Sequence, residues 1–213
     1  MIPLSIQFLL FQAAAQELRV EASRWSKKDN TIVSTVDCMA EHMEFLAIHH
    51  SKLSVVDPIR GTRLSYDATA KKGFIECAGG ILKSALDLTS LARPLSSFCV
   101  DKRLQSQMNA TLDRVVTMCQ QLKILAAVKA SSPEDDDADS TLITCAKNII
   151  DSMNEALRQS EASSLRLPPE GKGLLIGSKG TVRFRRTLYR KTGKTALPST
   201  PRRPSAYDKL KGY

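Results

Sequence analysis

The sequence lacks the patterns that mark common enzyme families. It contains no HExxH metalloprotease pattern, no GxSxG nucleophile turn and no Walker phosphate loop, so we predict no catalytic role. His42, His49 and His50 fall within one expected helix, but no close cysteine or carboxylate partners complete a metal geometry around them. We therefore expect a structural or solvent-facing role for these histidines, and neither a metal nor another cofactor.

Paired cysteines and a membrane-length apolar run are missing as well. The five cysteines are dispersed with no CxxC pair, which favours reduced, mostly buried thiols in a cytoplasmic protein. The start, MIPLSIQFLLFQAAAQ, resembles a signal peptide in its short apolar run. However, it has no basic n-region, is too short to cross a bilayer, and continues directly into the helical sequence AAAQELRVEASRW. We expect it to be retained.

Charge is distributed unevenly along the chain. Residues 166–213 contain 13 lysines and arginines against 2 acidic residues, a net charge of +11, whereas the whole chain carries +9. The first 165 residues are therefore close to neutral. A cationic arm of this kind is attracted to acidic lipid head groups, acidic protein surfaces or nucleic acid, with a strength that salt reduces.

Helical periodicity dominates as far as residue 165, and strand signals are weak. Apolar residues recur every three or four positions, as the buried face of a helix requires. Short connections between long helices predict an all-α, antiparallel bundle. The expected helices run from Leu4 or Gln7 to Trp25, from Asn30 to Lys52, from Ala70 to Phe98, from Asp101 through QLKILAAVKA, and onward from the acidic stretch SSPEDDDADS.

Three regions follow from these patterns. Residues 1–11 form an apolar lead-in, residues 12–165 form the helical bundle, and residues 166–213 form a basic, largely irregular and partly disordered arm. The carboxylates of SSPEDDDADS are best explained as a solvated loop that favours the start of the next helix.

The stretch QLKILAAVKA, residues 121–130, carries apolar residues on two sides of its helix. The stripe from Leu104 to Leu125 marks the core face. At about 100° per residue, Ile124 and Val128 project about 160° to 240° away from the centre of that stripe and lie close to each other. They predict a small outward apolar patch, unless a neighbouring helix or segment covers it.

Two motifs in the arm suggest binding to polyanions. LLIGSKG resembles the glycine loop of a KH domain, but the chain that follows is too short for the rest of such a domain. RFRRTLYRK alternates cations with Phe184, Leu188 and Tyr189, a pattern suited to an anionic membrane interface. The alternative for this second motif is a solvated tail.

Several runs together resemble the tail of the vinculin family, in the order in which they occur there. They are EASRWSKKDNTIV, KKGFIECAGGILKSA, CVDKRLQSQMNATLDRVV, QLKILAAVKA, AKNIIDSMNEALRQSEASS and LYRKT, and they span about residues 12 to 192. The actin-binding domain of α-catenin is a close relative, but the ending RRTLYRKT next to EASSLRL favours vinculin.

The resemblance implies a five-helix bundle that acts as an adaptor between the actin cytoskeleton and adhesion sites at the inner face of the plasma membrane. The implied partners are filamentous actin, phosphatidylinositol bisphosphate and the vinculin head, with a possible homodimer on actin and no nucleic acid. The implied actin-binding residues are Ile124, Val128, Lys123 and Lys129. The implied lipid-binding residues are Lys71, Lys72, Arg190 and Lys191, and the head-contact residues are Asp101, Lys102 and Arg103.

The sequence also departs from the family pattern. Gln105 and Asn154 stand where vinculin has basic residues, and 21 residues follow Thr192. A chain of 213 residues cannot hold a vinculin head as well as a tail. Three alternatives therefore stay open: an α-catenin-like module at cell–cell junctions, a nucleic-acid-binding protein acting through the arm, and a regulator that binds only the vinculin head.

Overall fold

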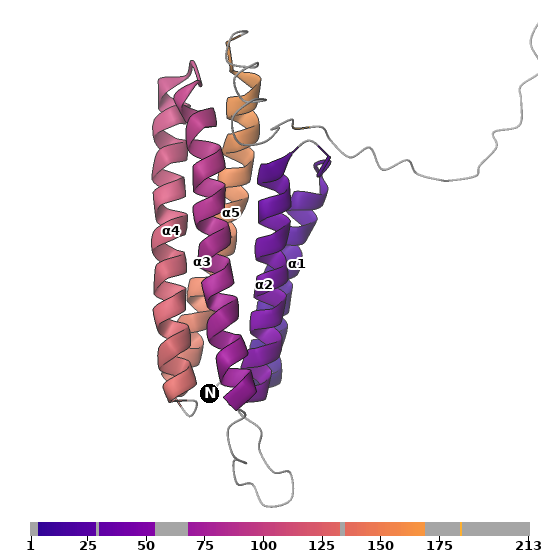
Figure 1. The fold of residues 1–213 in the computed structure, drawn as a ribbon, viewed down its shortest axis with the longest axis vertical. Coiled ribbons are helices and arrows are strands. Elements are labelled where there is room, and N and C mark those ends of the chain that lie inside the picture. The colour runs from indigo at the N-terminus through magenta and orange to yellow at the C-terminus, as the bar shows by residue number, and fades with distance from the viewer. Residues whose placement is uncertain (1–3, 29, 54–67, 133–134, 169–183, 185–213) are drawn as a thin grey trace, which may run out of the picture.

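Five long α-helices make up the ordered part of this computed structural model, which describes residues 4–28, 30–53, 68–132, 135–168 and 184 (Figure 1). The predicted all-α class is confirmed. The loop predicted around Pro58 and Gly61 and the motif LLIGSKG lie outside the described residues. The helices are α1 (Leu4–Ser23), α2 (Thr31–Leu53), α3 (Ala68–Ser97), α4 (Lys102–Ser131) and α5 (Asp136–Leu165).

Successive helices run in opposite directions and pack side by side into a closed bundle. Each helix packs against the next one along the chain, and α5 returns to pack against α1. We call the end of the bundle where α1, α3 and α5 finish the upper end, and the end with the α4–α5 turn the lower end, as drawn in Figure 1. α5 packs against all four of the other helices.

Three of the helices begin at residues that cap their free backbone N–H groups. The Asn30 Oδ1 atom accepts a hydrogen bond from the N–H of Val33 at 3.2 Å. The Asp101 carboxylate accepts from two N–H groups at the start of α4, and Asp135 does the same for α5. These caps satisfy donors that a helix cannot pair internally, and they confirm the starts predicted from Asn30, Asp101 and the acidic stretch.

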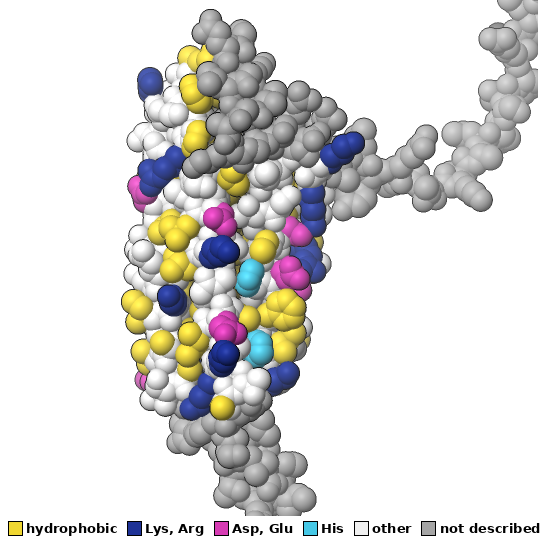
Figure 2. Space-filling model, viewed as in Figure 1, with side chains coloured by type: hydrophobic (Ala, Val, Ile, Leu, Met, Phe, Trp, Pro, Cys, Tyr) yellow, Lys and Arg dark blue, Asp and Glu magenta, His cyan; other side chains and the backbone are white. Residues whose placement is uncertain are grey.

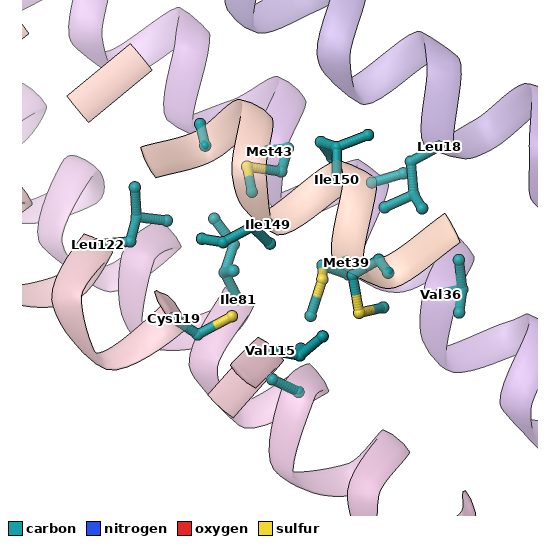
Figure 3. Packing of buried hydrophobic residues seen from close by; sticks show 14 of the residues in the cluster. Leu18, Val36, Met39, Met43, Ile81, Val115, Cys119, Leu122, Ile149 and Ile150 are labelled. Carbon is teal, nitrogen blue, oxygen red and sulfur yellow. The ribbon is translucent and has the colours of Figure 1, made fainter. Parts of the chain in front are cut away.

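Apolar side chains from all five helices fill the centre of the bundle. Figure 3 shows Leu18, Met39, Ile81, Cys119 and Ile149 converging from α1, α2, α3, α4 and α5. On α4 the predicted stripe from Leu104 to Leu122 is buried, and Leu125 is partly buried. Helical spacing alone therefore placed the core face of this helix correctly.

The first helix begins at Leu4, the earlier of the two starting residues predicted for it. α1 begins at Leu4 and runs through to Ser23 without interruption. Phe11 is 1% exposed and belongs to the core. Residues 4–11 thus belong to the same helix as the residues that follow, with Phe11 in the core and Leu9 and Leu10 exposed. None of the described helices is both long and apolar enough to cross a membrane.

Two histidines of α2 rest on two glycines of α3. His42 lies over Gly80 and His49 over Gly73, so each pair is seven residues from the other on its own helix. A Cβ atom at either glycine would overlap the imidazole ring. The glycines therefore allow the rings to lie between the helices. Gly79, beside Gly80, faces open space and has no such neighbour.

This packing predicts different effects on stability for two adjacent substitutions. Gly79→Ala should stabilise the bundle by about 0.5 to 1 kcal/mol, because alanine costs less backbone entropy in a helix. Gly80→Ala should lose that gain, because the His42 ring must move and give up the 2.8 Å contact between its Nδ1 atom and the carbonyl of Cys38. Urea unfolding of both variants measures the difference. Equal stabilisation would show that His42 moves aside freely.

Candidate functional site

The outward face of α4 carries two exposed apolar side chains. Ile124 is 64% exposed and Val128 is 46% exposed, while Leu122 and Ala126 on the same helix are fully buried. Ile124 and Val128 are one helical turn apart, so they form one patch. The prediction that both side chains point away from the core is confirmed.

A groove between α4 and α5 extends this patch. The groove has a volume of about 570 Å³, and Ile124, Met118 and Leu125 line its α4 side. Cys145 and Thr144 contribute from α5, and the lining is more apolar than polar. A side chain of a partner that contacts Ile124 could therefore also enter the groove and lose contact with water.

The two lysines predicted to flank the patch have different environments. Lys123 is exposed and remains available to a partner. Lys129 is 1% exposed, and its Nζ atom lies 2.7 Å from Asp139 Oδ1. The expectation that Lys129 flanks the patch at the surface is wrong, because its side chain turns inward to a buried carboxylate.

Lys129 belongs to a buried ionic cluster at the lower end of the bundle. His50 Nε2 lies 2.9 Å from the same Asp139 Oδ1 atom, and Lys129 Nζ also donates to the carbonyl of Asp135 at 2.9 Å. The His50 ring packs against Phe11 of α1 and Phe74 of α3, with ring centroids 5.4 Å and 5.7 Å apart. This cluster thus connects all five helices.

Sequence reasoning missed the cluster although the spacing contained a signal. Asp139 lies three residues before Leu142, the first residue of the predicted apolar stripe of α5, so it faces the core. His50 and Lys129 likewise continue the buried positions of their own helices. The assignment of Asp139 to a solvated loop is therefore wrong: the acidic run caps α5 through Asp135, but Asp139 points inward.

The partners of Asp139 change its proton affinity. Burial alone raises the pKa of this carboxyl, but hydrogen bonds and charge from His50 and Lys129 outweigh that effect, so the pKa is lowered from its ordinary value. Asp139 therefore remains ionised in a buried position. Within the described residues, no group of three or more metal-ligating side chains is close enough to hold a metal ion.

The predicted lipid-binding residues are only partly described. Lys71 is half-buried, and Lys72 is exposed with its Nζ atom 3.8 Å from Glu76 Oε1. Both lie at the lower end, near the start of α3. Arg190 and Lys191 lie outside the described residues. Phe184 of the arm packs edge-on against Trp25 with ring centroids 5.5 Å apart, at the upper end.

The predicted head-contact residues lie at the start of α4. Asp101 caps the helix and forms a 3.2 Å ion pair with Arg166, so it has a clear structural role. Lys102 and Arg103 are exposed. Lys102 Nζ donates to Gln105 Oε1 at 3.2 Å. Gln105, at a position predicted to be basic in the family, thus accepts a hydrogen bond that a basic side chain could not accept.

The departure at Asn154 also has a structural role. Its Nδ2 atom donates to Glu17 of α1 at 3.2 Å, and one turn later Arg158 Nε lies 3.2 Å from Glu21. Asn154 and Arg158 thus join α5 to α1.

The cysteines are free thiols and most of them are buried, as predicted. All five are free thiols, and Cys99, Cys119 and Cys145 are buried. Burial, followed by the neighbouring Cys145, raises the pKa of Cys119 to about 12. Such thiols react slowly with oxidants because the thiolate is the reactive form.

Comparisons with known proteins agree on one family. A sequence profile described as "Vinculin family" matches residues 3–179. Vinculin of Homo sapiens is 33% identical over 163 residues, which are 73% of this chain and 13% of the human protein. Vinculin of the sponge Oscarella pearsei is 34% identical over 175 residues, which are 79% of this chain and 19% of that protein.

A solved structure shows the same relationship. It is a vinculin homolog in a sponge, described as revealing vertebrate-like cell adhesions, and it is 28% identical with a TM-score of 0.70. The match covers 88% of this chain and 21% of that chain. This chain therefore spans only a small part of these relatives.

The buried cluster predicts a specific loss of stability in acid. Because the folded pKa of Asp139 is lowered, its contribution is complete above the unfolded pKa of about 3.9 and disappears as pH falls through the folded value. Asp139→Asn should cost about 3 kcal/mol at pH 7, because it leaves Lys129 buried without its carboxylate. Urea unfolding should show this difference shrinking below about pH 4.

Asp151→Asn is the matched control, since Asp151 is exposed on the same helix. It should change stability little at any pH. A cost for Asp139→Asn that stays constant down to pH 2 would contradict the role given to the charged cluster.

Proposed function

Because this chain belongs to the vinculin family, we propose that it is an actin-filament-binding module of a cytoskeletal adhesion adaptor. It would act in the cytoplasm, at adhesion sites on the inner face of the plasma membrane. We propose filamentous actin as its main partner and no catalytic role. The observation that carries the proposal is the outward patch of Ile124 and Val128 on α4.

The patch has the properties of a binding surface. Ile124 and Val128 are exposed on a helix whose opposite face is tightly packed, so they contribute nothing to the core. The adjoining groove of about 570 Å³ gives a partner an apolar surface to fill. Burial of each side chain could contribute on the order of 1.5 kcal/mol to binding. Lys123 would add a favourable charge toward the acidic surface of actin.

We propose two further partners. Acidic phosphoinositides would contact Lys71 and Lys72 on α3 together with Arg190 and Lys191 in the arm. A vinculin head would contact the start of α4 through Lys102 and Arg103, with Asp101 holding that start in place. Both proposals come from the family resemblance, and the exposure of Lys72, Lys102 and Arg103 is consistent with them.

Two alternative functions remain, one that uses the bundle and one that uses the basic arm. An α-catenin-like module at cell–cell junctions would also bind actin through α4. A nucleic-acid-binding protein would instead depend on the arm, whose charge of +11 is sufficient for non-specific binding. The second alternative predicts binding that survives changes at Ile124 and Val128.

Co-sedimentation with actin filaments tests the main proposal. The double variant Ile124→Ala, Val128→Ala should bind at least tenfold more weakly than the unmodified chain, because both apolar contacts are lost. Val20→Ala, Leu86→Ala is the matched control, since those side chains are 50% and 49% exposed on α1 and α3. Circular dichroism should confirm that both variants remain helical.

A chain ending at Pro168 separates the patch from the arm. This truncation keeps the ion pair between Arg166 and Asp101 and the buried side chain of Leu167. If the truncated chain no longer binds actin but the α4 double variant still does, electrostatic attraction by the arm, and not the α4 patch, would be responsible for binding. If none of these forms pelleted with actin at low or moderate salt, actin binding would be excluded as the primary function.

A further inference from the structure

The outward face of α3 carries a stripe of apolar residues. Leu86 is 49% exposed and Ile75 is 38% exposed, and Leu82 between them is half-buried. Gly79 completes the series, so the four positions are separated by four, three and four residues. This spacing keeps them on one side of the helix, as in the seam between two paired helices. We call these four residues the α3 stripe. Figure 2 shows hydrophobic side chains over α3 and α4 on this face of the bundle.

Gly79 stands in the middle of the α3 stripe, where packing within the bundle does not require a glycine. A Cβ atom there would meet nothing within 4 Å among the described residues, whereas Gly73 and Gly80 make room for histidine rings. A glycine inside a helix costs about 0.5 to 1 kcal/mol relative to alanine. The missing side chain does, however, leave a gap that a large side chain of a second helix can enter. The position therefore suits a contact that a single chain does not contain.

Four charged side chains run along α3 beside the stripe. Lys72, Glu76, Lys83 and Asp87 are all exposed, and their charges alternate in sign. Figure 2 shows a column of alternating basic and acidic side chains along α3. Lys72 Nζ lies 3.8 Å from Glu76 Oε1, but such exposed pairs within one helix contribute little to stability. The spacings are four, seven and four residues, so the column has opposite signs when it is read from its two ends.

The α3 stripe fits a copy of itself that runs in the opposite direction. About a two-fold axis midway between Gly79 and Leu82, each Leu82 enters the gap at Gly79 of the second copy. The same axis sets each Ile75 against Leu86 of the second copy, because both pairs of positions are centred on the same point of the helix. A two-fold symmetric contact requires a surface that is complementary to itself, and the α3 stripe meets this requirement.

The charged column is complementary to itself in the same arrangement. Glu76 lies beside Lys83 of the second copy, and Lys72 lies beside Asp87 of the second copy. Because the symmetry makes each pair twice, ion pairs run along the whole edge of the apolar contact. In a parallel, in-register pair each of these residues would instead lie level with its own like charge. The charges therefore select the antiparallel orientation.

We propose that this chain associates with a second copy of itself through α3, in an antiparallel and two-fold symmetric pair. The α3 stripe forms the centre of the contact and the charged column forms one edge. The contact needs no filament, so it differs from the homodimer on actin that the family resemblance implies. A seam of about three helical turns is small for a protein interface, so the dissociation constant should be on the order of tens of micromolar.

Sedimentation equilibrium of the full chain without actin measures this association. The unmodified chain should approach the mass of a dimer at about 300 micromolar. Gly79→Leu fills the gap that Leu82 of the second copy needs, so it should raise the dissociation constant at least tenfold. The new side chain faces open space in the single bundle, so circular dichroism should show unchanged helix content. Gln16→Leu, which adds a leucine to the exposed face of α1, is the matched control and should leave association unchanged.

Charge reversal gives a second test, which a change in the stability of the single bundle cannot imitate. Glu76→Lys and Lys83→Glu should each weaken association severalfold, because each variant sets like charges against each other twice. An equimolar mixture of the two variants should restore association, since the contacts between the two different chains again join opposite charges. Glu41→Lys, exposed on α2, is the control for a change in net charge. Added salt should weaken the restored pair.

Three results would overturn the proposal. A chain that stays monomeric at about 300 micromolar would assign the α3 stripe to a helix of another protein. Association that Gly79→Leu leaves unchanged would place the contact elsewhere on the bundle. A mixture of the two charge variants that associates no better than either variant alone would exclude the two-fold axis. Because no actin is present, each of these results is distinct from a failure of the actin proposal.

Discussion

The buried cluster of His50, Asp139 and Lys129 is the contact on which the rest of the bundle depends. One carboxylate oxygen of α5 binds a lysine of α4 and a histidine of α2, and the histidine ring packs on aromatic rings of α1 and α3. Charged groups at 1–2% exposure are costly to bury unless each has a partner. Pairing these buried groups therefore favours the observed register of the five helices at the lower end.

That register determines which side chains of α4 are exposed. Val128 and Lys129 are neighbours, so fixing Lys129 inward fixes Val128 outward, and Ile124 follows one turn earlier. The outward patch is thus a consequence of the buried ion pair as well as of the apolar stripe. A change in the cluster would alter the presentation of the patch although no residue of the cluster reaches the surface.

Most of the fold and part of the surface could be predicted from the sequence. The apolar spacing from Leu104 to Leu125 was sufficient to orient α4, because a helix with one buried stripe has one possible core face. Lys129 continues the same stripe, but helical spacing does not identify the buried carboxylate that a lysine in the core requires. Its inward position depends on Asp139, and Asp139 in turn on His50, 89 positions away in the chain. Such long-range pairing of polar groups leaves only a weak trace in local periodicity.

The contact between Trp25 and Phe184 gives the molecule a built-in optical reporter. Trp25 is the single tryptophan of the chain, and it is 6% exposed at the place where the arm meets the bundle. Its ring meets Phe184 at an interplanar angle of 90°. All indole emission therefore originates at this one junction, so undocking of the arm would shift the fluorescence spectrum without any added label.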